Sequence, residues 1–426
     1  MEEMSTAAVI VSCDSHAGPR LRRDLRAYCP SEHLDEYDAF VNAYEAAQAV
    51  PPADPALAAI ARDFAAHPNA ALAGHYDMAA RITDMNHDGV AAEVIYHASQ
   101  NGEPLPFMSD PNGGLSPVPV GGFALGAAGY HIYNAWLADF VSLEPERHIG
   151  LMYLPMWDID AATRELEWAA DAGLRGVNFP PPSRAGHLEY NHPAWDPFWS
   201  ACEAHGVALH THSSGAAPFD YFAGPGGRDL LAYECGGWMA RRAIWWLIYG
   251  RVFDRHPRLR LVITEQYEGW WTATLAELDA VHARFGRSEL AKPPSEYARE
   301  HVLLGCSFLS SHFAEQAHRE GFVANVLWGR DYPHVEGTFQ SRADANAEPI
   351  SQLSLRCAIS TLPPDEREMI AGANAVRELG LDGPALARVA ERIGAPSVEQ
   401  LGDHPAELPP IYERSNAFRG QAGPGW

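Results

Sequence analysis

The sequence predicts a (β/α)₈ barrel, and two observations support this fold. Eight short apolar segments occur between residues 7 and 331, and most are separated by stretches with helical patterning. Strands that alternate with helices form parallel sheets, and eight such units close into a TIM barrel. Acidic and histidine residues directly follow several of the segments. In this fold, the carboxyl end of the strands is where active sites lie.

The elements can be assigned in chain order. The predicted strands are residues 7–13, 89–96, 149–154, 174–179, 207–212, 259–265, 302–306 and 326–331. Helices are expected at 31–48, 55–66, 129–143, 160–172 and 194–205, and as extra C-terminal helices within 341–402. We therefore expect a distorted barrel over residues 1–402, with loop insertions 17–88, 98–128 and 213–258 covering its mouth, and a Pro/Gly-rich tail at 403–426.

Composition narrows the possible partners. The chain of 426 residues is 47% hydrophobic and carries a net charge of −24, so we expect neither a nucleic-acid surface nor a contact with anionic membranes, which both need basic patches. No apolar run approaches the roughly 18 residues of a membrane span. The six cysteines form no Cys-x-x-Cys pair, and the N-terminus is acidic. This pattern indicates reduced thiols and a cytoplasmic location.

The chain contains a single lysine, Lys292, in a Pro-rich segment. Lysine-based covalent catalysis is therefore not expected. No predicted strand carries a lysine that, once carboxylated, would bridge two metals. The sequence thus favours a mononuclear metal site.

Candidate metal ligands follow the first and fifth predicted strands. Asp14 and His16 are two residues apart, so both can face one ion, although Asp14 can instead orient His16 from outside the coordination sphere. His210 and His212 are also two apart. Spacing alone leaves open which of these two histidines binds the metal, and the other becomes an acid/base group or a loop histidine.

Two carboxylates end later strands. Glu265 ends the sixth strand, where it can bind the metal, accept a proton or pair with an arginine. Asp331 ends the eighth, and we expect it to take the proton of a metal-bound water and deliver it to a leaving group. His334, three residues further on, can assist Asp331 or cap the following turn.

The ordered set of these motifs carries a family resemblance. It consists of Asp14-Ser-His16, the segment Asp84-Met-Asn-His-Asp-Gly-Val90, His210, and Gly329-Arg-Asp331-Tyr-Pro-His334. With it the sequence resembles the amidohydrolase superfamily, in particular the amidohydrolase-related branch that includes aminocarboxymuconate semialdehyde decarboxylase.

The resemblance implies a ligand set and an assembly. One divalent ion (Zn, Fe, Mn or Co) is expected on Asp14, His16, His210 and Asp331, in an enzyme that forms a homodimer. The chain departs from the family at two points. Its first strand ends in Asp-x-His where many relatives have His-x-His, and Glu265 stands where the decarboxylase has histidine.

Substrate contacts are predicted at three further places. Arg20 and Arg23 belong to an arginine-rich stretch after the first strand, which is either a solvated face or a site for a carboxylate or phosphate, such as those of a CoA-linked substrate. His334, three residues after Asp331, is the second place. Trp238 belongs to an aromatic segment that either packs in the core or lines a pocket for a bulky apolar substrate.

Three functions follow in order of preference. The first is a metal-dependent hydrolase, in which a metal-activated water attacks an amide, ester, lactone or thioester and Asp331, Glu265 and His212 are catalytic. The second is a non-oxidative decarboxylase of an aromatic or enoic acid. The third is a catalytically inactive binding barrel. In all three, the partner is a small molecule.

Overall fold

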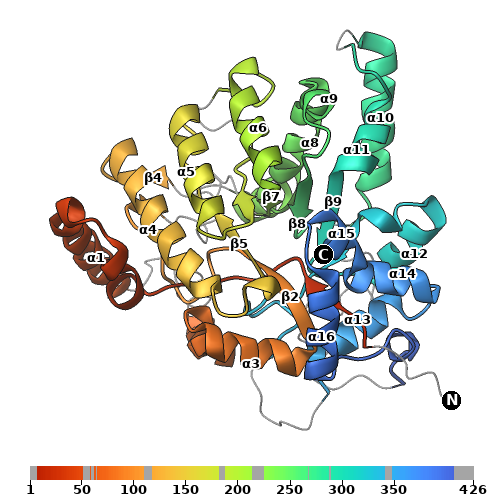
Figure 1. The fold of residues 1–426 in the computed structure, drawn as a ribbon, viewed down its shortest axis with the longest axis horizontal. Helices are drawn as coiled ribbons and strands as arrows, with labels where there is room; N and C mark the ends of the chain where they lie inside the picture. The colour runs from red at the N-terminus through yellow and green to blue at the C-terminus, as the bar shows by residue number, and fades with distance from the viewer. Residues whose placement is uncertain are drawn as a thin grey trace.

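The barrel expected from the sequence is confirmed in the computed structural model. The structure describes residues 7–50, 58, 62–63, 65–109, 118–181, 188–213, 225–266, 268–286, 289–340 and 348–406. Eight parallel strands form one sheet in which sequence neighbours pair side by side, and helices surround it (Figure 1). The strands are β1 (Ile10–Ser12), β2 (Val90–Ile95), β5 (His148–Met152), β6 (Gly176–Asn178), β7 (Ala208–His212), β8 (Leu261–Thr264), β9 (Val302–Cys306) and β10 (Val326–Trp328).

Hydrogen bonds between the first and last strands close the ring. The amide of Cys13 donates to the carbonyl of Trp328 at 2.8 Å, and the amide of Asp331 donates to the carbonyl of Asp14 at 3.0 Å. The Ser12 hydroxyl links the same two segments, because it accepts from the Arg330 amide at 3.0 Å and donates to the Asp14 carbonyl at 2.7 Å. This seam brings residues from the two ends of the barrel sequence into contact.

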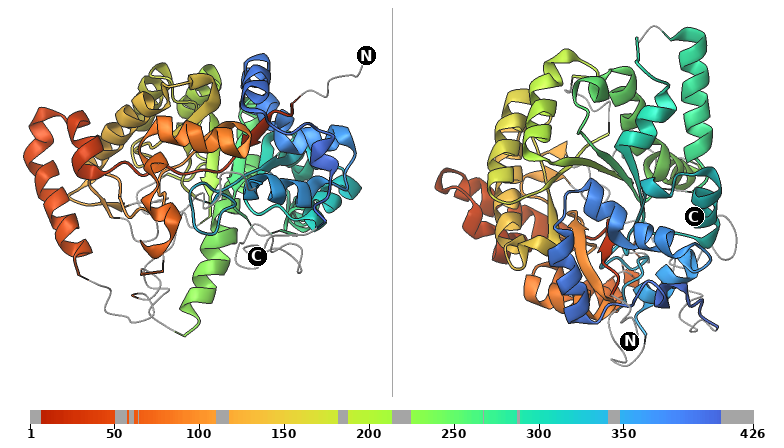
Figure 2. Two further views of the ribbon diagram at one scale, coloured as in Figure 1. Left: turned by 90° about the horizontal axis from the view of Figure 1, so that it is seen from below. Right: turned by 45° about the vertical axis from the view of Figure 1, so that its right-hand side comes forward.

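Most of the helices form the outer ring. In chain order, the described helices are α1 (Leu34–Gln48), α3 (Met78–Asp88), α4 (Phe123–Val141), α5 (Ile159–Asp171), α6 (Asp196–His205), α7 (Gly227–Tyr233), α8 (Met239–Tyr249), α9 (Val252–Arg255), α10 (Trp271–Phe285), α11 (Pro294–His301), α12 (Ser311–Glu320), α13 (Ile350–Ile359), α14 (Pro364–Glu368), α15 (Asn374–Glu378) and α16 (Gly383–Ile393). Helix α1 lies apart from the ring, at one edge of the molecule (Figures 1 and 2). Short 3₁₀ and π turns join several of these helices.

Helix α4 begins at Phe123, six residues before the predicted start at 129. Its first turns contain Gly126, which lies in the segment predicted as a loop, and Gly129, the predicted first residue of the helix. A Cβ at Gly129 would lie 2.0 Å from the carbonyl oxygen of Pro106, so this glycine allows the helix to contact the preceding backbone closely. The segment before it contains a two-stranded antiparallel pair, β3 (Met108–Ser109) and β4 (Val118–Pro119).

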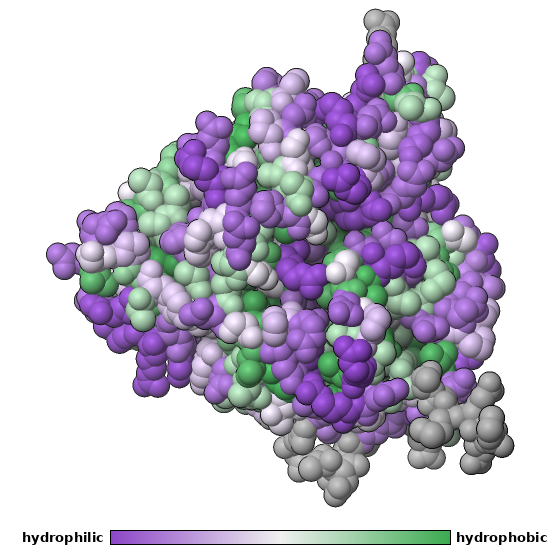
Figure 3. Space-filling view, in the orientation of Figure 1, coloured by the Kyte–Doolittle hydropathy of each residue, from purple (hydrophilic) through white to green (hydrophobic). Residues whose placement is uncertain are grey.

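The C-terminal helices pack back onto the N-terminal strands. Helix α16 contacts β2, and the amide of Ala8 donates to the carbonyl of Pro396 at 2.9 Å. Most of the predicted helix at 55–66 and the tail beyond residue 406 lie outside the described residues, and the domain boundary at 402 stays a prediction. In the described part of the chain, no helix is both long and apolar enough to cross a membrane. The face seen in Figure 3 is largely polar, with smaller apolar areas between.

Candidate metal centre

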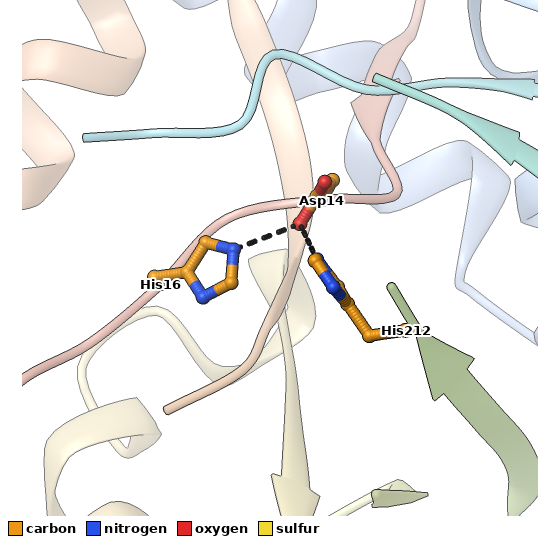
Figure 4. Close-up of side chains that lie close together, drawn as sticks. All are labelled: Asp14, His16 and His212. Atoms are coloured by element: carbon orange, nitrogen blue, oxygen red, sulfur yellow. Dashed lines mark hydrogen bonds and ion pairs between the residues drawn. The ribbon is translucent and has the colours of Figure 1, made fainter. Parts of the chain in front are cut away.

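Four predicted site residues converge at the carboxyl ends of three strands. Asp14 and His16 follow β1, His212 ends β7, and Asp331 follows β10. The Nε2 atom of His16 lies 3.2 Å from Oδ1 of Asp14 and 3.3 Å from Oδ1 of Asp331. The Nε2 atom of His212 lies 3.3 Å from the same oxygen of Asp14 (Figure 4). These residues form two groups of possible ligands that share His16: Asp14, His16 and His212 in one, and His16, Asp331 and His334 in the other.

Backbone carbonyls fix the tautomers of the two histidines. Nδ1 of His16 lies 2.6 Å from the carbonyl oxygen of His97, and Nδ1 of His212 lies 3.0 Å from that of Ser213. A carbonyl only accepts, so each Nδ1 carries a proton and donates it. Each Nε2 can then present a lone pair to an ion, which is the arrangement found in protein metal sites.

The separations and the missing partners fit a divalent cation. Two donors that are each about 2.1 Å from one ion, in tetrahedral or octahedral geometry, lie about 3.0–3.4 Å apart. Within the described residues, Nε2 of His16 and Oδ2 of Asp331 have no hydrogen-bond partner although they are fully buried, and Oδ1 of Asp331 lies beside ring nitrogens of His16 and His334. Buried polar atoms are rarely left unpaired. Two nitrogens and two carboxylates form a donor set that suits Zn, Fe, Mn or Co.

Asp14 is held as an anion at this centre. Burial alone would raise its pKa, but the neighbouring His212 and His16 lower it well below its ordinary value. Its other oxygen accepts a hydrogen bond from Ser307, which directly follows β9. Gly329 leaves the space for Asp14, because a Cβ on that glycine would lie 2.9 Å from the Asp14 Cβ.

His210 faces the same interior but does not join the four donors. His210 lies two residues before His212 on β7. Its ring centroid is 6.2 Å from that of Tyr96, whereas the ring centroid of His212 is 4.8 Å from that of Tyr96. Burial lowers the pKa of His210 to about 3, so the ring is neutral. No group of metal-competent side chains among the described residues includes His210. The structure brings His212, not His210, to Asp14 and His16.

Glu265 stands beside the centre at the end of β8. Its carboxylate accepts a hydrogen bond from Ser213, and one of its oxygens lies 3.3 Å from Nδ1 of His212. Burial raises the pKa of Glu265 to about 8. Glu265 and Asp331 both adopt left-handed backbone angles, with φ of 54° and 52°. Such angles are uncommon outside glycine and cluster at functional sites.

His334 is part of the centre. Its ring stacks on His16 with centroids 3.8 Å apart, Nδ1 lies 2.9 Å from Oδ1 of Asp331, and Nε2 donates to the carbonyl of Ala98 at 2.7 Å. Burial works against a charged ring, but the nearby Asp331 raises the pKa of His334 to about 10. Of the two roles considered for His334, the contact with Asp331 supports assistance rather than turn capping alone.

The other predicted substrate contacts lie outside this centre. The guanidinium of Arg20 forms a bidentate pair with Asp24 and stacks on Tyr76. Arg23 is exposed. Trp238 is 45% exposed and contacts Arg242 and Trp245 rather than the metal ligands. Their predicted roles in substrate binding stay predictions.

Two functional neighbours were missed in the sequence. Ser307, which donates a hydrogen bond to Asp14, directly follows strand β9. Tyr96 follows β2 and packs against His16 and His212, while its hydroxyl lies 2.9 Å from that of Thr264. Both residues directly follow a barrel strand, and this position in the sequence is the feature that could have identified them.

The fold and the donor set together are those of a barrel enzyme with a site that can hold a divalent metal ion. The sequence profile of the amidohydrolase family matches residues 63–381, most of the chain. The chain therefore belongs to the amidohydrolase family. This confirms the resemblance, although the match begins after the Asp14–His16 pair.

Among curated proteins, the chain is similar to decarboxylases. It is 31% identical over 143 residues to gamma-resorcylate decarboxylase of Rhizobium radiobacter, and 30% identical over 143 residues to that of Polaromonas sp.. The matched stretch covers 32% of this chain and 43–44% of those relatives. The chain thus spans less than half the length of the curated relatives it matches.

Solved structures show the same fold over nearly the whole chain. The 5-carboxyvanillate decarboxylase of Sphingomonas paucimobilis superimposes with a TM-score of 0.57 at 22% identity, covering 88% of this chain and 100% of that one. The 5-carboxyvanillate decarboxylase of Novosphingobium aromaticivorans, in complex with manganese and 4-hydroxy-3-methoxy-5-nitrobenzoic acid, gives 0.57 at 18% identity, with 88% and 96% covered. At these identities the likeness shows the fold.

Proposed function

We propose that the protein is a metal-dependent, non-oxidative decarboxylase of an aromatic carboxylic acid. The two groups of possible ligands that share His16 carry this proposal: Asp14 and His212 lie on one side of it and Asp331 on the other, and the buried Nε2 of His16 and carboxylate of Asp331 lack the partner that a divalent ion would supply. The curated relatives and several solved structures are decarboxylases of aromatic acids. These comparisons favour decarboxylation over the hydrolysis that the sequence first suggested.

We assign the metal to Asp14, His16, His212 and Asp331. His212 replaces the predicted His210 in this set, because its Nε2 reaches Asp14 and its Nδ1 is held by a carbonyl. Manganese is the first ion to test, since structures of related decarboxylases contain it. When bound, the ion supplies a Lewis acid that holds and orients the substrate carboxylate.

The chain itself must supply and store a proton. Decarboxylation adds a proton to the ring carbon that carries the carboxylate, and the bond to that carboxylate then breaks to release CO₂, with no oxidant needed. Asp331 is the proposed proton donor, because it stands in the centre and contacts Nδ1 of His334. Glu265 is a second carboxyl group within reach of Asp331 and can return a proton to it.

The experiment is incubation of manganese-loaded protein with a panel of hydroxybenzoic acids in D₂O. Decarboxylation predicts stoichiometric CO₂ and one deuterium at the former carboxyl position, seen by NMR. Asp331→Asn should abolish both signals. Turnover that releases no CO₂ would refute the proposal.

Hydrolysis of a carbonyl substrate is the second candidate, and the position of Glu265 favours it. A carboxylate beside the ligands can act as the general base for an attacking water. Incorporation of ¹⁸O from labelled water into a product carboxylate would identify this reaction. Decarboxylation leaves that label out of the organic product.

Other sequence-based expectations stay predictions. They are the cytoplasmic location, the homodimer and the CoA-linked substrate. The proposal of a CoA-linked substrate is weakened, because Arg20 and its neighbours Arg22 and Arg26 in the arginine-rich stretch after the first strand already pair with carboxylates. An inactive binding barrel predicts no bound metal after growth in metal-replete medium, and metal analysis of the purified protein tests it.

A further inference from the structure

A buried network of charges lies directly behind the metal centre. Arg81 on α3, Glu93 on β2 and Arg330 after β10 are all fully buried. Glu93 joins the two arginines: its Oε1 accepts from Nε of Arg81 at 2.5 Å, and its Oε2 accepts from Nη2 of Arg330 at 3.0 Å. Nη1 of Arg330 also contacts Asp88 at 3.0 Å. The two positive and two negative charges balance.

Each arginine is directly connected to a proposed metal ligand, Arg81 by a hydrogen bond and Arg330 by a peptide bond. Nη1 of Arg81 donates to the backbone carbonyl of His16 at 2.6 Å. Arg330 immediately precedes Asp331 in the chain, and its side chain is anchored at both ends of the guanidinium. Glu93 therefore connects, through two guanidinium groups, the segment that carries His16 and the segment that carries Asp331.

The sequence motif on α3 serves the same network. Arg81, Asp84 and Asp88 are spaced by three and four residues, so they share one face of the helix. Asp84 accepts a hydrogen bond from the Tyr332 hydroxyl at 2.8 Å, and Asp88 pairs with Arg330. One helix face thus holds the segments after β1 and β10 at once.

We propose that Arg81 is a positioning residue that sets the distance between His16 and Asp331 through Glu93 and Arg330. This role rests on the ligand set proposed above. Buried ion pairs often stabilise a fold no better than apolar residues of similar size, so stability alone gives little reason for four buried charges here. Hydrogen bonds behind metal ligands typically tune affinity about 10- to 100-fold.

A second buried arginine provides a matched control. Arg147 is also fully buried and also contacts β2: it donates to the carbonyls of Val90 and Ala91 at 2.9 Å each, and pairs with Glu144. Val90 begins β2, so these contacts lie at the end of the strand away from the metal centre. Loss of Arg147 should therefore weaken the fold without altering the site.

The test compares Arg81→Met with Arg147→Met by calorimetric Mn²⁺ titration and by Mn²⁺ electron paramagnetic resonance, with thermal unfolding measured in parallel. Both variants should unfold at lower temperature. Only Arg81→Met should weaken Mn²⁺ binding, about 10- to 100-fold, and change the spectrum. Equal effects on affinity in both variants, or an unchanged affinity in Arg81→Met, would overturn the proposal.

Three further variants keep the result interpretable. If Arg81→Met does not fold, Arg81→Lys against Arg147→Lys repeats the comparison, because lysine keeps Glu93 paired but loses the fixed geometry of the guanidinium. His16→Ala tests the ligand set separately. If it leaves Mn²⁺ affinity unchanged, the ligand assignment fails, which is distinct from a failure of the role of Arg81.

Discussion

Gly329 allows a sharp test of the metal centre, because it is the residue against which Asp14 packs. A Cβ at this position would lie 2.9 Å from the Asp14 Cβ, 3.2 Å from the Cys13 Sγ and 3.3 Å from the Ser307 Cα. Ordinary contacts begin at 3.4 Å, so Gly329→Ala must push Asp14 away by about 0.5 Å. Metal–ligand distances in working sites hold to about ±0.2 Å. The expected displacement exceeds this tolerance.

The expected result is a selective loss of metal binding. Overpacking of this kind costs about 1–3 kcal/mol of stability, which should leave the barrel folded. Calorimetric titration of the chelator-treated protein with MnCl₂ should show at least tenfold weaker binding in Gly329→Ala. Thermal unfolding monitored by circular dichroism measures the stability cost in the same samples.

Gly150→Ala is the matched control. Gly150 lies on β5, and its added Cβ would also meet a neighbour at 2.9 Å, the terminal methyl of Leu174. That contact is apolar and the leucine end can move. Gly150→Ala should therefore lower stability with Mn²⁺ affinity intact. Normal affinity in Gly329→Ala, or the same loss in both variants, would refute the placement of Asp14 in the metal centre.

Three further predictions concern the ligands, the metal and acid stability. His212→Ala should remove most Mn²⁺ affinity while His210→Ala lowers only stability; calorimetry that gave the reverse order would restore the original assignment of His210. Chelation by EDTA should lower the melting temperature of the purified protein, because an ion present at 100 times its Kd stabilises the folded state by about 2.7 kcal/mol; an unchanged melting temperature would count against a bound ion. Glu144 tests acid stability: hydrogen bonds from Arg392, and also from Arg147, lower its pKa from 4.5 to about 2. Because the folded-state pKa is the lower one, the ionised group stabilises the protein above about pH 4.5, and this contribution disappears as the pH falls to about 2. Glu144→Gln should therefore cost about 1–2 kcal/mol at pH 7, after allowance for partial exposure, and nothing near pH 2; urea unfolding that showed the same difference at both pH values would contradict this.

The sequence predicts the barrel well because its strands are short apolar runs that punctuate a helical chain. All eight predicted strands occur, and Asp14, His16 and Asp331 stand where strand ends place them. The choice between His210 and His212 was beyond such reasoning. Alternation along a strand assigns both residues to one face, and only the three-dimensional arrangement shows that Nε2 of His212 lies beside Asp14.

The features that the sequence did not predict depend on contacts between segments that are distant in the chain. Glu93 and Arg330 are 237 residues apart, and nothing in local periodicity links them. The arginines after β1 looked available for a ligand because their partners Asp38 and Glu45 come from helix α1, which folds back over them. Helix α4 was shortened in the prediction because its glycines serve a tertiary contact rather than a turn.

The seam between β1 and β10 has a consequence for how the protein matures. Two proposed ligands precede residue 20 and another is Asp331, so a nascent chain carries an incomplete cation site until the segment that contains Asp331 has left the ribosome. The complete site would then form, and bind the ion, only after β1 and β10 have come together. Loss of the ion would in turn loosen the barrel first at this junction.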